Sequence, residues 1–307
     1  MKLIRVGAAG AEVPAVLGPA GERFDVSSIT SDFDRSFFAG GGVADLQRRW
    51  AAGEVESLPT LDPRARLGPP IARPGHLVCA GLNYADHAAE SGMALPDEPL
   101  LFTKAPNSVI GPTDDAYIPR GRTKVAEPAT RIAVGSAGPP RSASQVDYEV
   151  ELALVIGSTC RYLESPADAW SCIAGFVVSN DVSERSFQLD HGGQWMKGKS
   201  AETFNPLGPW LVTTDEVDIA AGLDLWLDVD GERRQTGRTT SMIFPVDTLV
   251  HYISQFLVLD PGDLVNTGTP PGVAMGMAEP RWLQAGQVVT AGISGLGEQR
   301  TRFVPAP

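Results

Sequence analysis

The sequence of 307 residues has few cysteines and no long hydrophobic run. Its three cysteines, Cys79, Cys160 and Cys172, are odd in number and show no Cys-x-x-Cys spacing. This excludes a disulfide framework and the usual zinc motifs, and reduced thiols of this kind are typical of a cytoplasmic protein. No apolar stretch approaches the roughly 18 residues of a membrane span, and the N-terminus lacks the apolar core of a signal peptide. We therefore expect a soluble, cytoplasmic protein with no membrane partner.

Positive charge is also scarce. Lysine and arginine total 25 against 37 aspartates and glutamates, which gives a net charge of −12. Nucleic-acid binding needs clustered cations, so this balance argues against a nucleic-acid partner. A small anion can still bind where local cations or a metal ion provide a positive field.

Aromatic residues make up only 7% of the chain, whereas its 33 glycines and 25 prolines are abundant. This composition favours many short strands joined by turns, and so a β-rich α+β fold. Helical patterns occur near 43–53, where Gly53 is a predicted C-terminal cap, and near 245–257. Asp230-Gly231 predicts a hairpin turn. The segment 121–145 has no sustained period and predicts a long loop.

A proline-rich stretch, LDPRARLGPPIARPG at 61–75, is typical of a connector. We therefore divide the chain into a small N-terminal domain, residues 1–70, and a main domain, residues 71–307.

Two glutamates of the run DYEVELALVIG, at 147–157, predict a metal site. If the run is a strand, Glu149 and Glu151 share one face, about 7 Å apart by the usual rise of a strand. Asp181 ends a second apolar run, IAGFVVSND, and would emerge at the rim of the same sheet. Three carboxylates held together need a shared cation, and oxygen ligands suit Mg²⁺, Mn²⁺ or Ca²⁺ better than zinc. The alternative is a solvent-facing strand with ordinary exposed glutamates.

Polar and cationic residues follow Asp181 in DVSERSFQLDHGGQWMKGKS, at 181–200. Arg185, Gln188 and Lys199 lie within about 20 residues of that aspartate, and Gly198 would let the backbone approach a ligand closely. Cations beside a metal cluster suit an anionic, oxygen-rich substrate.

The stretch GLNYADHAAESG, at 81–92, places His87 and Glu90 three residues apart. On a helix the two side chains share a face, where a carboxylate can fix the tautomer of an imidazole and raise its basicity. The alternative is a surface histidine next to a solvated charge.

Five motifs, in order, resemble the fumarylacetoacetate hydrolase superfamily across about residues 70–305. They are DYEVELALVIG, SNDVSERSFQ, QWMKGKS, TFNPLGPWLVT and PGDLVNTGTPPGV. The resemblance implies a mixed β-sandwich-like roll, a small N-terminal α/β domain, one Mg²⁺ or Mn²⁺ ion and a homodimer. Within the superfamily, the sequence most resembles hydrolases of 2,4-diketo-3-deoxy-L-fuconate or rhamnonate. Some similar sequences carry the label ureidoglycolate lyase.

The resemblance also implies roles for individual residues. The metal ligands are expected to be Glu149, Glu151 and Asp181. Residues expected to contact the substrate are Arg185, Gln188, Thr269 and Lys104. The catalytic residues are expected to be His87, Glu90 and Lys199.

The implied reaction is hydrolysis of a carbon–carbon bond in an anionic 2,4-diketo acid. His87, oriented by Glu90, would activate a water that attacks C4, while the metal and Lys199 stabilise the departing pyruvate enolate. Two reactions of the same superfamily compete with this hypothesis, oxaloacetate decarboxylation and isomerisation of an unsaturated diacid. Two alternatives come from other classes of protein, a glycosidase that uses two carboxylates and a non-catalytic, metal-stabilised binding protein. Each of these would also contain a pair of acidic residues.

Overall fold

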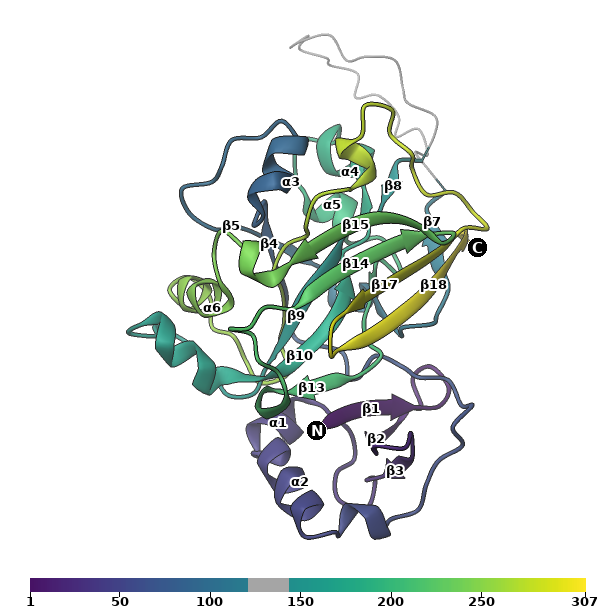
Figure 1. Cartoon of the computed structure of the whole chain (residues 1–307), viewed down its shortest axis with the longest axis vertical. Coiled ribbons are helices and arrows are strands. Elements are labelled where there is room, and N and C mark those ends of the chain that lie inside the picture. The colour runs from purple at the N-terminus through teal and green to yellow at the C-terminus, as the bar shows by residue number, and fades with distance from the viewer. Residues whose placement is uncertain (121–143) are drawn as a thin grey trace, which may run out of the picture.

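The computed structural model describes residues 1–120 and 144–307 (Figure 1). Nearly all of the long loop predicted at 121–145 lies outside these residues. The described chain is rich in strands, which confirms the β-rich α+β prediction. It contains no helix long and apolar enough to cross a membrane.

Two main sheets form the architecture. Across the described residues, one sheet has nine strands in the order β3-β2-β1-β13-β10-β9-β16-β4-β5. The other has five, in the order β15-β14-β17-β18-β7. The strands of the larger sheet are β1 (Lys2–Val6), β2 (Val13–Leu17), β3 (Arg23–Asp25), β4 (Leu77–Gly81), β5 (Leu100–Lys104), β9 (Val150–Ile156), β10 (Ile173–Asn180), β13 (Leu211–Thr213) and β16 (Leu264–Asn266).

The strands of the smaller sheet are β7 (Ala116–Ile118), β14 (Asp224–Val229), β15 (Glu232–Arg238), β17 (Val288–Ile293) and β18 (Gly297–Pro305). Short strand pairs join β8 (Val146–Asp147) to β11 (Ser183–Glu184) and β6 (Val109–Ile110) to β12 (Asn205–Pro206). The α-helices are α1 (Arg35–Ala39), α2 (Gly42–Ala51), α3 (Ala85–Glu90), α4 (Arg185–Leu189), α5 (Met196–Lys199) and α6 (Val246–Ser254).

Several local predictions are confirmed. Helices α2 and α6 lie where the patterns placed them, and Gly53 follows α2 with φ +74°. Asp230 and Gly231 join β14 to β15 with φ values of 51° and 81°, as a tight hairpin turn between twisted strands requires.

The first 70 residues share the larger sheet with the rest of the chain. β1 pairs antiparallel with β13, with Lys2 opposite Val212. Side chains of both segments also meet in one hydrophobic cluster, where Leu3 and Phe37 accompany Val155. The division at residue 70 stays a prediction.

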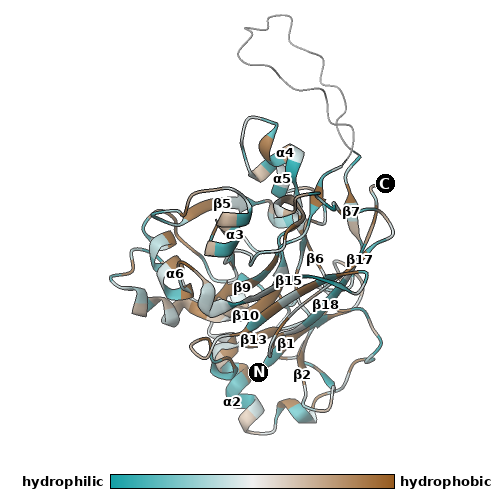
Figure 2. Cartoon of the chain, turned by 45° about the horizontal axis from the view of Figure 1, so that its top comes forward, coloured by the Kyte–Doolittle hydropathy of each residue, from teal (hydrophilic) through white to brown (hydrophobic). Residues whose placement is uncertain are grey.

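Strand β9 is buried on both faces. Leu152 and Leu154 pack in the core that also holds Leu227 of the smaller sheet. On the opposite face Ala153 and Val155 pack in the core that includes side chains of α1 and α2. In Figure 2 the hydrophobic colour runs through β9 and β10, whereas α2 is mostly hydrophilic. A carboxylate on such a strand is therefore withheld from water, and α3, α4 and α5 gather at the upper end of the sheets (Figure 1).

Candidate active site

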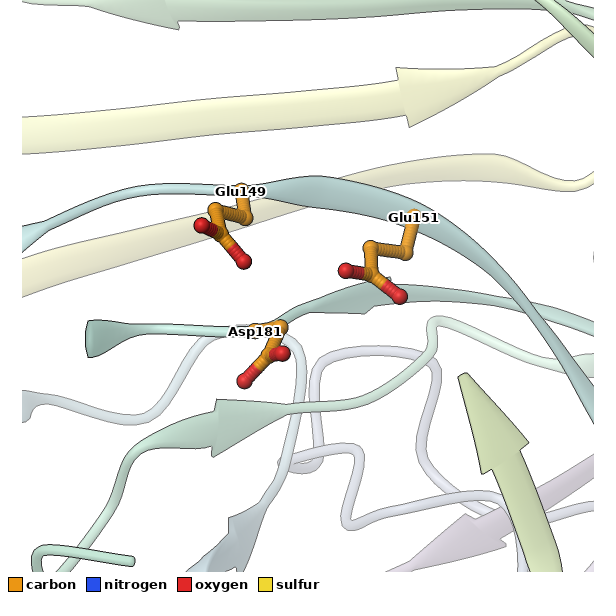
Figure 3. Close-up of side chains that lie close together, drawn as sticks. All are labelled: Glu149, Glu151 and Asp181. Atoms are coloured by element: carbon orange, nitrogen blue, oxygen red, sulfur yellow. The ribbon is translucent and has the colours of Figure 1, made fainter. Parts of the chain in front are cut away.

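The three predicted carboxylates converge where β9 and β10 lie side by side (Figure 3). The strands pair antiparallel, with Ser179 opposite Glu151, and the Asp181 amide donates to the Glu149 carbonyl at 2.8 Å. This register brings one oxygen of each carboxylate within 4.8 Å of the others. Glu149, Glu151 and Asp181 are 4%, 1% and 0% exposed, which excludes the alternative of ordinary surface glutamates.

Two cations contact this carboxylate triad directly. Lys199 Nζ donates to Glu149 Oε2 at 2.5 Å and to Asp181 Oδ2 at 2.9 Å, and Arg185 Nη2 donates to Glu149 Oε1 at 2.5 Å. Burial alone would raise the pKa of Glu149, but Lys199 and Arg185 outweigh it and lower this pKa to about 2. The same carboxylates raise the pKa of the buried Lys199 ammonium despite its desolvation.

Glu151 is the member of the triad whose negative charge is least compensated by its neighbours. Burial, followed by the negative charges of Asp181 and Glu149, raises the pKa of Glu151 well above its usual range. Its partner from the backbone is the Gly268 amide, which donates at 2.8 Å. A divalent cation among the three carboxylates would remove this repulsion, and the all-oxygen donor set fits Mg²⁺ or Mn²⁺.

The structure places Lys104 away from the predicted contact with the substrate. Its Nζ donates to Asp181 Oδ1, to the Phe204 carbonyl at 2.6 Å and to the Val182 carbonyl at 3.3 Å. All three ammonium hydrogens therefore have protein acceptors, and the side chain lies outside the residues that line the cavity described below. Lys104 instead neutralises and orients the Asp181 carboxylate.

His87 and Glu90 form the pair expected from their spacing on α3. His87 Nδ1 lies 2.8 Å from Glu90 Oε1, and the imidazole is only 5% exposed. The carboxylate also accepts from the Gly272 amide, at 2.8 Å through Oε2. The surface-histidine alternative is therefore excluded, because the imidazole is buried and its partner Glu90 is tied to a loop from the far end of the chain.

Asp147 is a contributor that our sequence reasoning missed. Its Oδ1 accepts from the Ala274 amide at 2.7 Å, and its Oδ2 accepts from the Met275 amide at 3.0 Å and from Arg185 Nε at 2.9 Å. It thus links Arg185 to the loop that also holds Glu90. Its position within DYEVELALVIG was the one sequence feature that could have indicated this role, because the loop amides that it binds are more than 120 residues away in the chain.

A cavity of about 420 Å³, open solvent included, collects most of these groups. Its polar lining is His87, Ser91, Glu149, Glu151, Arg185, Gln188, Lys199 and Thr269. Gln188 Oε1 accepts from Arg185 Nη1 at 3.0 Å. The Thr269 hydroxyl donates to the Val150 carbonyl at 2.9 Å and accepts from Gln235 Nε2 at 2.8 Å.

Gly198 has a packing role that its place in the motif did not predict. A Cβ at this position would lie 2.5 Å from the Glu184 carbonyl oxygen and 2.7 Å from the Gln188 nitrogen. Glycine is needed here so that α5 can pack against the backbone of α4. That packing places Lys199 beside Arg185.

The geometry agrees with a comparison of the whole chain with known proteins. Residues 76–304 match the sequence model described as fumarylacetoacetate (FAA) hydrolase C-terminal. The chain belongs to the fumarylacetoacetate hydrolase family. The resemblance inferred from the five motifs is confirmed at the level of the superfamily, whereas the sugar-acid subgroup stays a prediction.

Other members of the fumarylacetoacetate hydrolase family match along nearly the full chain. A Burkholderia cenocepacia (strain HI2424) protein, provisionally named a hydrolase, is 44% identical over 303 residues, or 98% of both chains. A structure of an HpcE-type protein from Mycobacterium smegmatis is 33% identical with a TM-score of 0.80. The fumarylacetoacetate hydrolase structure from Exiguobacterium antarcticum is 32% identical with a TM-score of 0.79. Both structures cover 100% of both chains.

Proposed function

We propose that this protein is a divalent-metal-dependent hydrolase of 2,4-diketo acids. It would cleave the C3–C4 bond of an acylpyruvate, or of a diketo-deoxy sugar acid, to give pyruvate and a carboxylic acid. The observation that carries the proposal is one cavity lined both by the buried His87, which is paired with Glu90, and by Glu149 and Glu151 of the carboxylate triad. A metal-dependent hydrolase of this kind needs both a base for water and a cation site for the keto acid.

Glu149, Glu151 and Asp181 would hold the metal ion. A bound Mg²⁺ or Mn²⁺ ion would supply Lewis-acid stabilisation of negative charge on the 2-oxo acid. The choice between the two ions is left to experiment, since both take oxygen ligands.

His87 would act as the general base. With Nδ1 directed at Glu90, the other ring nitrogen is left as the proton acceptor. It would take a proton from water as the water oxygen bonds to C4. The C3–C4 electron pair would then leave with the pyruvate fragment as an enolate, which is protonated at C3. Glu90 holds the ring in this orientation, since Gly272 fixes the carboxylate in turn.

The buried cations would stabilise the charge that develops on the pyruvate fragment. The Lys199 ammonium stands at the triad without a water shell, so its field acts in a medium of low dielectric constant. Arg185 would orient the carboxylate end together with Gln188, while Asp147 holds the guanidinium in place.

A turnover screen tests the proposal. Acylpyruvates, diketo-deoxy sugar acids, oxaloacetate and an unsaturated diacid would be offered with Mg²⁺ or Mn²⁺, and pyruvate release and isomer formation would be followed. Hydrolysis of a diketo acid that stops on chelation supports the proposal. Turnover of oxaloacetate or the diacid alone would identify a decarboxylase or isomerase, and no turnover with a lowered melting temperature on chelation would identify a binding protein.

A further inference from the structure

The cavity is lined by two chemically different sets of side chains, which we call its charged wall and its apolar wall. The charged groups described above form one of them. The other is apolar and consists of Ala80, Leu82, Met93, Phe102, Leu189, Trp195 and Met275. Site pockets that fix a ligand by a few polar groups commonly bury its remainder against such side chains.

Leu82 has an unusual backbone conformation for a residue of this wall. Its φ is 55°, in the left-handed region that an L-residue other than Gly, Asn or Asp rarely adopts. Glycine would be relieved of this strain, because it has no Cβ. Leu82 lies directly after β4 and lines the cavity. A leucine in this strained conformation indicates that its side chain has a function in the cavity.

Trp195 and Phe102 are fixed in place by close packing. Their rings meet edge to face with centroids 5.4 Å apart. A Cβ on Gly81 would lie 2.7 Å from Trp195 Cζ3, so the indole packs directly on the end of β4. Lys199 Nζ lies 5.1 Å from the centre of the Phe102 ring. The apolar wall therefore begins immediately beside the charged one.

The charges of the site do not provide for a second carboxylate on the substrate. Four buried carboxylates, those of the triad and Asp147, face three buried cations, Lys104, Lys199 and Arg185. Together with Glu90, which accompanies His87, these groups carry two negative charges in excess, so a divalent ion would neutralise them and leave no cation for a second substrate carboxylate. Among the described lining residues, both Arg185 and Lys199 are already paired with carboxylates.

Hydroxyl partners are equally few on the apolar side. Ser91 Oγ is buried without a partner among the described residues and lines the cavity. This hydroxyl offers one donor and two acceptor sites, which suit the C4 carbonyl or the water beside His87 but not a run of several substrate hydroxyls. A chain of substrate hydroxyls would leave several of them unpaired against leucine, methionine and aromatic rings, which is costly.

We propose that the acyl part of the substrate is uncharged and apolar, an alkyl or aryl group that packs against Leu82, Met93, Leu189 and Met275. This inference rests on the proposed hydrolase function and narrows its substrate class. It departs from the sugar acids that the sequence resemblance suggests, because those would place hydroxyls on the apolar wall.

The first test compares three acylpyruvates of equal chain length whose acyl group ends in a methyl, a carboxylate or a run of hydroxyls. The methyl-ended compound should have a kcat/KM at least about tenfold higher than either polar compound, since each polar compound would bury an unpaired polar group against the apolar wall. A higher kcat/KM for the carboxylate-ended or hydroxylated compound would overturn the inference while leaving the hydrolase function intact. Cleavage of none of the three would overturn the hydrolase function itself.

The second test measures binding without catalysis, by calorimetry in the presence of Mn²⁺. Oxamate presents the two-carbon keto-acid mimic alone, and N-benzyloxamate adds an apolar group. Leu82→Gly should weaken N-benzyloxamate by about tenfold and change oxamate by less than about twofold, with an unchanged or higher melting temperature. Equal binding of N-benzyloxamate to the variant and the parent would contradict the proposal.

Tyr162→Gly is the matched control for Leu82→Gly. Tyr162 also has a positive φ, 48°, but its side chain is 72% exposed and does not line the cavity. It should change the melting temperature without changing the affinity for either oxamate.

Leu189→Arg keeps the proposal testable if Leu82→Gly does not fold. Leu189 lines the cavity and is 42% exposed, so the fold should accept a long polar side chain there. The new cation should tighten binding of N-(carboxymethyl)oxamate about tenfold and weaken N-benzyloxamate. No change in either affinity would show that Leu189 does not face the acyl group and would count against the proposal.

Discussion

The Glu90 carboxylate holds His87 from one side and the Gly272 amide from the other. His87 Nδ1 lies 2.8 Å from Oε1, and Gly272 N lies 2.8 Å from Oε2. Helix α3 is only six residues long, so it is stabilised here by a loop more than 180 residues further along the chain. The orientation of the proposed base therefore depends on tertiary contacts, which the sequence spacing alone does not reveal.

Replacement of Glu151 by Gln should abolish metal binding with little loss of fold. A neutral amide removes one ligand and also relieves the repulsion with Asp181 and Glu149 that raises the pKa of Glu151. We expect a parent protein whose melting temperature rises with Mn²⁺ and a variant whose melting temperature does not respond. Metal-dependent turnover at the parent rate in Glu151→Gln would rule out the site.

The position of the metal site could be predicted because it depends on local rules. Alternation along the run that leads into β9 places Glu149 and Glu151 on one face, and an apolar run ending at Asp181 predicts a third carboxylate at a neighbouring strand end. Burial of both faces was harder to see. Ala153 and Val155 share the face of the glutamates, and only the packing of α1 and α2 shows that this face is covered.

Lys104 and Gly198 have structural roles that the sequence did not predict. Both residues lie close to the site, and both were interpreted as contacts of the ligand. Whether a buried lysine faces a cavity or a neighbouring carboxylate depends on the strands around it, and Lys104 faces Asp181 and two carbonyls. The same holds for the apolar wall, because Leu82, Leu189 and Met275 come from distant parts of the chain.

A homodimer is expected from the family resemblance. Light scattering at micromolar concentration should give a mass of twice the 32.5 kDa chain. A monomeric mass that persists after addition of Mn²⁺ would contradict this expectation.

Removal of the proposed base separates the candidate reactions. His87→Ala should lower hydrolysis of the preferred diketo acid by about 10²- to 10⁴-fold, the usual contribution of a general base. Oxamate binding with Mn²⁺ should be retained, because the triad lies at the start of β9 and directly after β10, whereas His87 lies on α3. Decarboxylation of oxaloacetate needs no activated water, so any such activity should survive.

Glu90→Gln is the companion variant, and it should give a weaker version of the same loss. Glutamine keeps the size of the side chain, but it has one acceptor oxygen where the carboxylate has two. It therefore cannot accept from His87 and from the Gly272 amide through separate oxygens. Hydrolysis by His87→Ala at the parent rate would show that the imidazole is structural.

The last prediction distinguishes packing from ligand approach at Gly198. Alanine there would meet backbone atoms of α4, the Glu184 carbonyl oxygen at 2.5 Å and the Gln188 nitrogen at 2.7 Å. Gly198→Ala should therefore destabilise the fold by about 1–3 kcal/mol in urea unfolding, as overpacking does. Gly193→Ala is the control, because its Cβ would meet nothing within 4 Å and only its φ of +67° is unfavourable. The displaced α5 should also move Lys199 and weaken oxamate binding in the first variant alone. An unchanged unfolding free energy together with weaker oxamate binding would instead support direct approach of the ligand to this backbone.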